Sequence, residues 1–335
     1  MRAPRCRWRL LVALCGLLAG TAAARDECPF LRDPAFHART AVAPAAGDEL
    51  AVGTLNLFRL FDDERDGHED VRLSRREFAA RIGRIAGYIV HDMGAPAAVG
   101  LQEIEDDTAA AALAAGVSRR SGREYRYLLG DKAPDSDIRN ALLYDARLTL
   151  QRTESLFAAR PYEKGPRFDR LPLLAEFDTG HGRLALVVVH LKSQVGIDRP
   201  DESARVLAKR RAQAGRLAAW VGDRGAGEPP LLVLGDFNAS ATDDDAARSE
   251  PLRMLLAGGA LVDVAGRFLR PTQRWTYRYR CSLQQLDHVL VSPALAGRVR
   301  GYAIARGDTC LRAPEKCSST RSISDHEGVV LRLGR

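Results

Sequence analysis

The sequence has 335 residues, of which 46% are hydrophobic and 28% are charged. This composition excludes an intrinsically disordered chain and a chain made mainly of membrane-spanning segments, and the length provides ample material for a core. The formal net charge of +7 gives weak support for a nucleic-acid partner, because a phosphate-binding surface is a local patch of charge.

Residues 1–24 have the order of a secretory signal peptide. Arginines precede an apolar stretch at residues 10–19, and alanines at 22–24 offer a small-residue cleavage site. The stretch is too short to span a bilayer as a permanent anchor. We therefore expect cleavage after Ala24, no stable membrane anchor, and a protein in the periplasm or outside the cell. Residues 1–24 hold four arginines and no acids, so their removal lowers the net charge from +7 to +3.

Four cysteines remain in the mature chain, at positions 28, 281, 310 and 317. In an oxidising compartment they predict two disulfides, for which three pairings exist. The short loop between Cys310 and Cys317 favours that pair and leaves Cys28 to pair with Cys281. A zinc site is the alternative, but zinc ligands usually come in C-x-x-C pairs and the sequence contains none.

Residues 25–47 lack clear periodicity and are predicted to form an N-terminal extension that lies over one α/β domain at residues 48–335. The first strand is expected at 49–58. Further strands are expected at 98–101, 140–144, 173–177, 184–190, 231–234, 285–291 and 328–333.

Three helices are predicted, one that begins at Ser74, one at residues 106–117 and one at residues 203–221. In the first, apolar residues recur at helical spacing, and Arg81 is assigned to another face. Arg210 belongs to an arginine-rich face of the third helix. We expect this face to be solvated; a contact with nucleic acid is the alternative.

Four polar clusters lie at or just after the ends of apolar strands: residues 101–103, 190–193, 235–238 and 324–326. A fifth, at 286–288, lies inside a strand-like segment. Ligands of open α/β sheets bind where strands end, so these clusters are expected to converge.

The clusters, together with the end of the first strand, supply oxygen ligands of the type that hold Mg²⁺ or Mn²⁺: Asn56, Glu103, Asp236, Asn238 and Asp325. His190 and His326 add groups that can transfer protons or donate hydrogen bonds to a phosphoryl oxygen. Phosphodiester hydrolysis needs this set, namely a cation, a base for water and donors for the non-bridging oxygens.

These motifs resemble, in the same order, those of the endonuclease/exonuclease/phosphatase superfamily with the DNase-I-like fold. The matching segments are Thr-Leu-Asn at 54–56, Leu-Gln-Glu at 101–103, Leu-Gly-Asp-Phe-Asn at 234–238, the Asp-bearing segment at 285–291 and Ser-Asp-His at 324–326. They span almost the whole mature chain. The resemblance implies a four-layered α/β sandwich, in which two packed β-sheets are flanked by helices.

The resemblance also implies residue roles. It makes Glu103 the principal metal ligand, with Asn56 and Asp325 beside it. It makes Asp236 the residue that orients or deprotonates the attacking water, with the help of Asn238.

For the histidines, the resemblance implies that His326 is the acid/base group, oriented by Asp287, and that His190 donates to the scissile phosphate. Residues 101–105 and 189–193 further resemble bacterial extracellular nucleases. This subgroup implies phosphate or substrate contacts at Lys192 and Arg139. The expected protein is a monomer that hydrolyses DNA or RNA.

Alternatives remain at this stage. A secreted phosphatase or a sphingomyelinase-like lipid phosphodiesterase would share the fold, and a non-catalytic binding module is a more distant alternative. His288 is interpreted as structural, and Asp263 either supports a site residue or caps a turn, with the turn cap favoured. Three aromatic residues at strand spacing either stack on bases or form a half-buried strand face: Trp275, Tyr277 and Tyr279.

Overall fold

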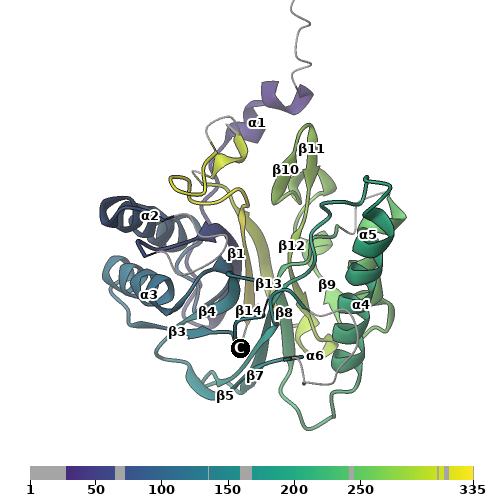
Figure 1. Ribbon diagram of the computed structural model, residues 1–335. Helices are drawn as coiled ribbons and strands as arrows, with labels where there is room; N and C mark the ends of the chain where they lie inside the picture. The colour runs from purple at the N-terminus through teal and green to yellow at the C-terminus, as the bar shows by residue number, and fades with distance from the viewer. Residues whose placement is uncertain are drawn as a thin grey trace, which may run out of the picture.

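The computed structural model describes residues 28–64, 72–134, 136–158, 168–240, 245–307, 309–312 and 317–334. The predicted signal peptide lies outside these residues. Two six-stranded sheets pack face to face, and helices cover their outer surfaces (Figure 1). The expected four-layered α/β sandwich is therefore confirmed.

The first sheet has the strand order β13-β14-β1-β2-β4-β3. Its strands are β13 (Val299–Ala305), β14 (Gly328–Gly334), β1 (Glu49–Leu60), β2 (Ala98–Ile104), β4 (Arg139–Asp145) and β3 (Tyr125–Leu129). Strand β1 runs parallel to β2 and antiparallel to β14. The outer face of this sheet is covered by α2 (Arg75–Gly87), its π-helical continuation η2 (Tyr88–Asp92) and α3 (Asp107–Ser121) (Figure 1).

The second sheet has the strand order β5-β6-β7-β8-β12-β9. Its strands are β5 (Thr149–Ser155), β6 (Leu173–Asp178), β7 (Arg183–His190), β8 (Leu231–Asp236), β12 (Asp287–Val291) and β9 (Val262–Asp263). Helices α4 (Ser203–Gly222) and α5 (Ala246–Ala257) lie on its outer face (Figure 1). The chain also contains four short helical turns: η3 (Ala265–Arg267), η4 (Pro271–Gln273), α6 (Pro293–Ala296) and η5 (Cys310–Arg312).

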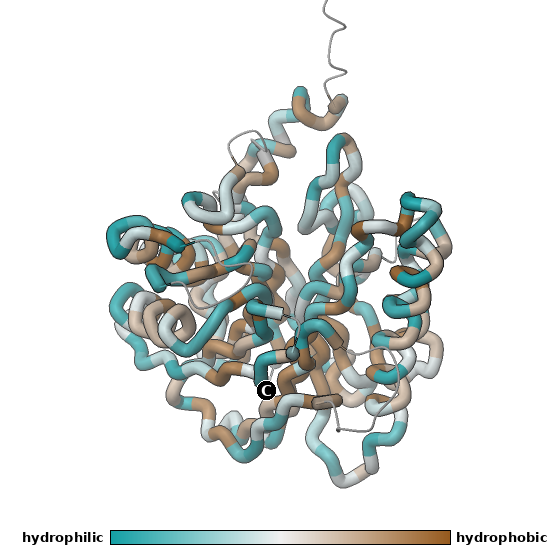
Figure 2. Tube along the Cα trace, viewed as in Figure 1, coloured by the Kyte–Doolittle hydropathy of each residue, from teal (hydrophilic) through white to brown (hydrophobic). Residues whose placement is uncertain are grey.

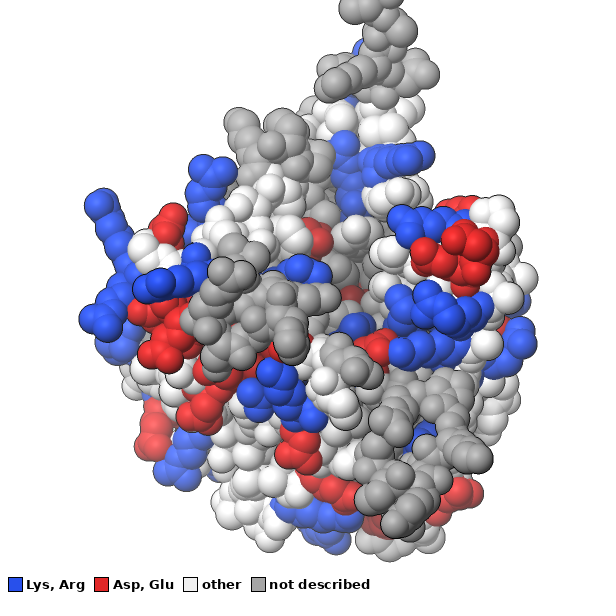
Figure 3. All heavy atoms as spheres, viewed as in Figure 1, with Lys and Arg blue, Asp and Glu red and all other residues white. Residues whose placement is uncertain are grey.

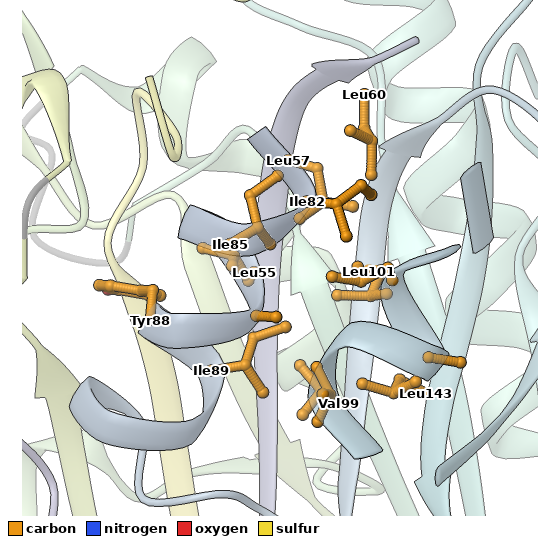
Figure 4. Close-up of a cluster of buried hydrophobic side chains, with 14 of the residues drawn as sticks. Leu55, Leu57, Leu60, Ile82, Ile85, Tyr88, Ile89, Val99, Leu101 and Leu143 are labelled. Carbon is orange, nitrogen blue, oxygen red and sulfur yellow. The ribbon is translucent and has the colours of Figure 1, made fainter. Parts of the chain in front are cut away.

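The sandwich has three apolar layers, one between the sheets and one beneath the helices on each side. Hydrophobic residues accordingly gather inside the molecule in Figure 2. Helix α2 begins with a capping box between Ser74 and Glu77. Its Ile82 and Ile85 pack with Leu55 and Leu101 of the first sheet (Figure 4). The predicted apolar face of this helix is thus confirmed.

A small additional core joins the N-terminal segment to a β-hairpin. The segment contains η1 (Pro29–Arg32) and α1 (Pro34–His37), and the hairpin consists of β10 (Tyr277–Tyr279) and β11 (Ser282–Gln284). Phe36 stacks on Trp275 with ring centroids 5.0 Å apart. Disulfides link Cys28 to Cys281 and Cys310 to Cys317, as predicted.

Two arginines correct the expectation from helical periodicity. Arg81 of α2 and Arg210 of α4 are 0% and 1% exposed, although both were assigned to faces outside the apolar stripe. Hydrogen bonds to main-chain carbonyls give partners to all three guanidinium nitrogens of Arg81 and to both Nη atoms of Arg210. Among the described residues, no helix is long and apolar enough to cross a membrane.

Candidate active site

The second sheet brings three predicted site residues into register. His190 at the end of β7 pairs with Asp236 at the end of β8, and Asp236 pairs with Asp287 at the start of β12. Directly paired residues project from the same face of a sheet. Each of the three stands two positions from a residue of the apolar layer between the sheets, such as Val188 or Leu234. The site is therefore the polar end of that layer.

Asn56 reaches the same region from the first sheet. It follows Val52 and Thr54 at the two-residue period of β1, so it also faces the second sheet. The side-chain nitrogen of Asn56 lies 3.2 Å from Oε1 of Glu103 and 3.2 Å from Oδ2 of Asp236. Asn56 thus joins carboxylates from both sheets.

Glu103 requires an irregular backbone to face the site. Its neighbour at the two-residue period, Leu101, packs in the layer beneath the helices, so a regular strand would turn Glu103 away. The register between β1 and β2 shifts between Asn56 and Leu60, and Glu103 itself has φ +63°. Such irregularities redirect side chains beside functional sites. Oε2 of Glu103 accepts a 2.9 Å hydrogen bond from the backbone N–H of Arg59.

Asp236 is held by the turn that follows β8. Its Oδ1 accepts the backbone N–H of Asn238 at 2.8 Å. Gly235 just before it has φ +141°, and a Cβ there would lie 2.0 Å from the carbonyl oxygen of Val189. Glycine is therefore required at this position. Asn238, at φ +50°, donates its side-chain amide to the carbonyl of Leu191 at 3.0 Å.

His326 forms a buried pair with Asp287. Its Nδ1 lies 2.7 Å from Oδ2 of Asp287, and its Nε2 lies 4.0 Å from Oδ2 of Asp236. Burial alone lowers the pKa of His326, but the carboxylates of Asp287, Asp325 and Asp236 outweigh burial and raise this pKa well above its usual value. The imidazole is therefore positively charged at neutral pH.

His190 has the opposite electrostatic environment. Its Nε2 lies 3.4 Å from Oδ2 of Asp236. Burial, together with the positive charges of Arg170, His326 and Lys192, lowers the pKa of His190 well below its usual value. The two histidines next to Asp236 thus differ in charge, which suits one to donate a proton and the other to remain neutral.

The carboxylates of the site carry an excess of negative charge. Burial raises the pKa of Asp236 to about 7 and the pKa of Asp325 to about 6, and Glu103 and Asp287 add repulsion to both. A divalent cation held by oxygen ligands would relieve this repulsion, so the residues fit Mg²⁺ or Mn²⁺. Asp236, Asp287 and His326 also place atoms that could bind a metal within 4.8 Å of one another. His326 and Asp287 are hydrogen-bonded to each other, however, so this trio is not assigned as the metal site.

Comparison with known proteins agrees with this geometry. Residues 53–326 match the Endonuclease/Exonuclease/phosphatase family. The chain belongs to this family. It is accordingly a hydrolase of phosphoester bonds. No curated protein sequence matches the chain.

Solved structures of family members show the same fold. The endonuclease/exonuclease/phosphatase from Beutenbergia cavernae is 20% identical with a TM-score of 0.58 and covers 86% of this chain and 72% of its own. The 3'-5' exonuclease NExo from Neisseria meningitidis is 18% identical with a TM-score of 0.53, covering 85% and 100%. D. rerio TDP2 complexed with a single-strand DNA product is 17% identical with a TM-score of 0.55, covering 86% and 99%.

In this family member, basic side chains gather beside His190. Lys192 follows β7 and has a pKa lowered by burial. Arg170 precedes β6 and donates to the carbonyl of Leu191 at 3.2 Å, while its Nε is buried without a hydrogen-bond partner among the described residues. Nε of Arg139, at the start of β4, is likewise buried without a hydrogen-bond partner among the described residues. Arg139 pairs with Ile104, next to Glu103.

Arg170 was not identified from the sequence. Its position follows only from the sheet, in which β6 runs antiparallel to β7 and the residues before β6 lie at the edge where His190 ends. Positive and negative side chains are interspersed over the molecular face in Figure 3, so this local cluster matters more than net charge.

The aromatic residues of the hairpin region have three different environments. Trp275 is buried, with the guanidinium of Arg306 3.5 Å from its ring centroid, and Tyr279 is 56% exposed. The ring of Tyr277 lies 4.8 Å from the ring of His326, and burial raises its pKa to about 12. Tyr277 thus forms part of the site wall.

Two structural interpretations from the sequence agree with the observed contacts. His288 is fully buried and its Nε2 lies 2.9 Å from the carbonyl oxygen of Ala239. Asp263 accepts the backbone N–H of Ala265 at 2.9 Å and so caps a turn.

Proposed function

We propose that this phosphoester hydrolase is an exported, metal-dependent nuclease that hydrolyses DNA, with RNA as a further polynucleotide substrate, by direct attack of water on phosphorus. The observation that carries the proposal is the convergence of Asp236 with one charged and one neutral histidine, since phosphodiester hydrolysis needs both a proton acceptor for water and a proton donor for the leaving oxygen. No serine or cysteine nucleophile is required.

In the proposed reaction, deprotonated Asp236 orients the water and accepts its proton, while Asn238 fixes the carboxylate through the hydrogen bond to Oδ1. Asp287 keeps His326 charged and presents its Nε2 to the phosphoryl group, where His326 donates a proton. Neutral His190 donates a hydrogen bond from Nε2 to a non-bridging oxygen. These fixed donors stabilise the charge that develops on the pentacovalent phosphorus.

The bound cation, Mg²⁺ or Mn²⁺, would supply further neutralisation of negative charge on the phosphate. Glu103 would hold it, with Asp325 and Asn56 beside it. The nitrogen of Asn56 donates to Glu103 in the present arrangement, and its Oδ1 accepts the N–H of Phe58 at 2.9 Å. Asn56 would therefore also serve by holding the Glu103 carboxylate in place.

Substrate binding is assigned to Arg139, Lys192 and, from the structure, Arg170. The positive charges of Lys192 and Arg170 act on His190, where the phosphate is expected, and Arg139 pairs with Ile104, next to Glu103. The DNA product bound to D. rerio TDP2 supports a polynucleotide substrate on this fold. We further propose that the signal peptide at residues 1–24 is removed on export and that the mature protein acts as a monomer.

Parallel incubation with supercoiled plasmid DNA, RNA and a sphingomyelin-type phosphodiester, each with Mg²⁺ or with excess EDTA, tests the proposal. We expect nicked and linear DNA only with the metal, and no product from His326→Ala. Cleavage of the lipid alone would favour the lipid phosphodiesterase. Activity that persists in EDTA would refute the metal requirement, and inactivity on every phosphoester would leave only a binding module.

A further inference from the structure

The two buried arginines come from opposite sides of the molecule and end at the same site. Arg81 belongs to α2, outside the first sheet, and Arg210 belongs to α4, outside the second. Helix α2 lies over β1 in Figure 4, and α4 lies on the far side of the other sheet in Figure 1. The guanidinium of each arginine donates hydrogen bonds to main-chain carbonyls of segments that carry site residues. The two arginines therefore support the site in the same way, from opposite sides.

Arg81 binds three consecutive carbonyls of β1. Its Nη2 donates to Leu57 and Phe58, each at 2.7 Å, and its Nη1 donates to Arg59 at 2.6 Å. Its Nε is 3.4 Å from the carbonyl oxygen of Ser322, just before the Ser-Asp-His segment. Phe58 and Arg59 have φ of +50° and +57°, a conformation that non-glycine residues adopt only when their surroundings hold them there.

The same peptide units contact the proposed metal ligands. Their oxygens accept hydrogen bonds from Arg81, and their N–H groups donate to the ligand side chains. The peptide whose oxygen is Leu57 O carries the N–H of Phe58, which donates to Oδ1 of Asn56 at 2.9 Å. The next peptide, whose oxygen is Phe58 O, carries the N–H of Arg59, which donates to Oε2 of Glu103 at 2.9 Å. Because a peptide unit is planar and rigid, fixing the oxygen fixes the direction of the N–H.

Arg210 connects the segments after β7 and β8. Its Nη1 donates to the carbonyl of Lys192 at 2.7 Å, and its Nη2 donates to Asn238 at 2.9 Å and Arg248 at 2.8 Å. Asn238 has φ +50° and donates its backbone N–H to Asp236. Arg210 therefore supports the wall that carries the water-orienting carboxylate and the basic cluster.

Arginine suits this task because its planar fork offers five N–H donors in fixed directions. Among the described residues, no carboxylate forms an ion pair with Arg81. A buried charge without such a partner contributes poorly to stability, whereas four carbonyl oxygens fit a guanidinium and not an ammonium. The chemistry thus points to orientation of the backbone.

We propose that Arg81 and Arg210 are positioning residues with separate tasks: Arg81 orients the ligands for the divalent cation, and Arg210 orients the wall that holds the attacking water and the phosphate. The inference rests on the proposed function of the site. It predicts that the two arginines affect different measured quantities, although both are equally buried.

The test compares Arg81→Met, Arg81→Lys, Arg210→Met and Arg210→Lys with two control variants. Ile85→Ala in α2 and Leu217→Ala in α4 remove fully buried apolar side chains of the same helices, which pack against the site-bearing strands but donate no hydrogen bond to their backbones. Mn²⁺ affinity of the full protein is measured by calorimetry without substrate, kcat and KM are measured on a single DNA oligonucleotide, and folding is checked by near-UV circular dichroism and thermal unfolding.

We expect Arg81→Met to weaken Mn²⁺ binding by roughly 10–100-fold, the range found when residues that orient metal ligands are removed. Arg210→Met should leave Mn²⁺ affinity within about twofold and lower kcat by roughly 10–100-fold. The lysine variants should fall between wild type and methionine, since an ammonium restores the charge but only part of the fork. Both controls should lower the unfolding temperature and leave Mn²⁺ affinity and kcat unchanged.

Equal Mn²⁺ affinity in Arg81→Met and Ile85→Ala, or equal kcat in Arg210→Met and Leu217→Ala, would overturn the corresponding assignment. Failure of both the Met and Lys variants to fold would assign that arginine to stability alone. A wild-type protein that binds no Mn²⁺ and cuts no DNA would refute the proposed function itself. Normal wild-type binding and cleavage combined with unaffected arginine variants would refute only the positioning roles.

Discussion

The two histidines of the site show how neighbouring residues can keep one imidazole charged and the other neutral. Nε2 of His190 and of His326 lie 3.4 and 4.0 Å from the same oxygen of Asp236. Asp287 compensates His326 through a 2.7 Å contact, whereas His190 faces the positive charges of Arg170 and Lys192. Proximity to Asp236 therefore does not determine whether a histidine is protonated. The other charged neighbours determine it, Asp287 for His326 and the basic side chains for His190.

Replacement of Asp287 by asparagine should inactivate His326 while preserving the shape of the site. Loss of the carboxylate lowers the pKa of His326, so the fraction of charged imidazole at neutral pH falls. We expect kcat to drop by about 10²–10⁴-fold, as for loss of a general acid. The alkaline limb of the pH–rate profile should move to lower pH, which steady-state rates on DNA between pH 5 and pH 10 would show.

Asp263→Asn is the matched control, because this carboxylate lies on neighbouring β9 and accepts only a turn N–H in the contacts described above. Its pH–rate profile should coincide with that of the wild type. An Asp287→Asn profile that lost rate without any shift of the alkaline limb would contradict the electrostatic role.

The carboxyl group of Asp236 should set the acidic limb of the same profile. Its pKa is raised to about 7 and only the deprotonated form can accept a proton from water, so the rate should increase as pH rises toward that value. A bound cation favours the carboxylate form of Asp236. The acidic limb should therefore lie at lower pH with saturating Mg²⁺ and shift to higher pH as Mg²⁺ becomes limiting. Titrations at two Mg²⁺ concentrations measure this. An acidic limb independent of Mg²⁺ would exclude this assignment.

Most residues of the candidate site could be named from the sequence because they stand in short polar motifs beside apolar strands and these motifs resemble those of the family in the same order. Arg170 could not, because its position depends on which strands are neighbours and in which direction they run. Arg81 and Arg210 were placed on solvated or non-core faces, because periodicity records which face is apolar and cannot record a carbonyl partner about twenty or more residues away in the chain.

At the scale of elements, the hairpin β10–β11 depends on the N-terminal segment. The hairpin, which includes Tyr277, is held in place by the disulfide from Cys28 to Cys281, by the stacked pair of Phe36 and Trp275 and by the cation of Arg306. Since Tyr277 contacts His326, this additional core helps to shape the site wall.

Removal of this bridge should therefore affect both stability and catalysis. In Cys28→Ser/Cys281→Ser we expect the free energy of unfolding to fall by about 2–5 kcal/mol. We also expect KM for DNA to rise, because the hairpin and Tyr277 lose their anchor. Urea unfolding and steady-state kinetics measure the two effects.

The Cys310→Ser/Cys317→Ser variant is a useful comparison, because its bridge closes a loop with a sequence separation of only 7 and should stabilise less by the chain-entropy argument. Unchanged KM in the first variant despite lost stability would show that the hairpin does not contribute to substrate binding.

The elements themselves were predictable to different degrees. Strands with continuous apolar runs, such as β7 and β8, were located within a few residues. Strand β5 was missed because most of its residues are exposed, and β13 because glycine and arginine interrupt its pattern. Helix α5 was missed because it contains Pro251 and shows little amphipathic character. Neighbouring strands stabilise β5 and β13, and packing against α4 and the second sheet stabilises α5.

At the scale of the whole molecule, the buried carboxylates link folding to pH and metal. The pKa of Asp236 rises from 3.8 to about 7 and that of Asp325 to about 6. Between about pH 4 and pH 7 the folded protein therefore retains protons that the unfolded chain has lost, and the free energy of unfolding of metal-free protein should fall as pH rises. His326 acts in the same direction above about pH 6.5, and His190 opposes it below that pH.

The stabilisation by Mg²⁺ should increase over the same interval, since the cation binds the deprotonated carboxylates. At a concentration of about 100 times its dissociation constant, a ligand adds about 2.7 kcal/mol to the free energy of unfolding. Thermal unfolding with Mg²⁺ and with EDTA at a series of pH values measures the difference. Glu103→Gln removes the proposed principal metal ligand and should reduce the difference in stability between Mg²⁺ and EDTA. A difference that does not depend on pH would show that these carboxylates do not bind the metal.

The disulfide pairing also determines an order of events during synthesis. Cys28 and Cys281 are 253 positions apart, so at about 5–20 residues per second roughly 13–50 s pass between their appearance. With residues 1–24 removed as proposed, Cys28 is the only cysteine that precedes Cys281, because Cys310 and Cys317 have still to be made when Cys281 emerges. These two then find only each other. Oxidation in the order of emergence thus selects the native pairing from the three that four cysteines allow.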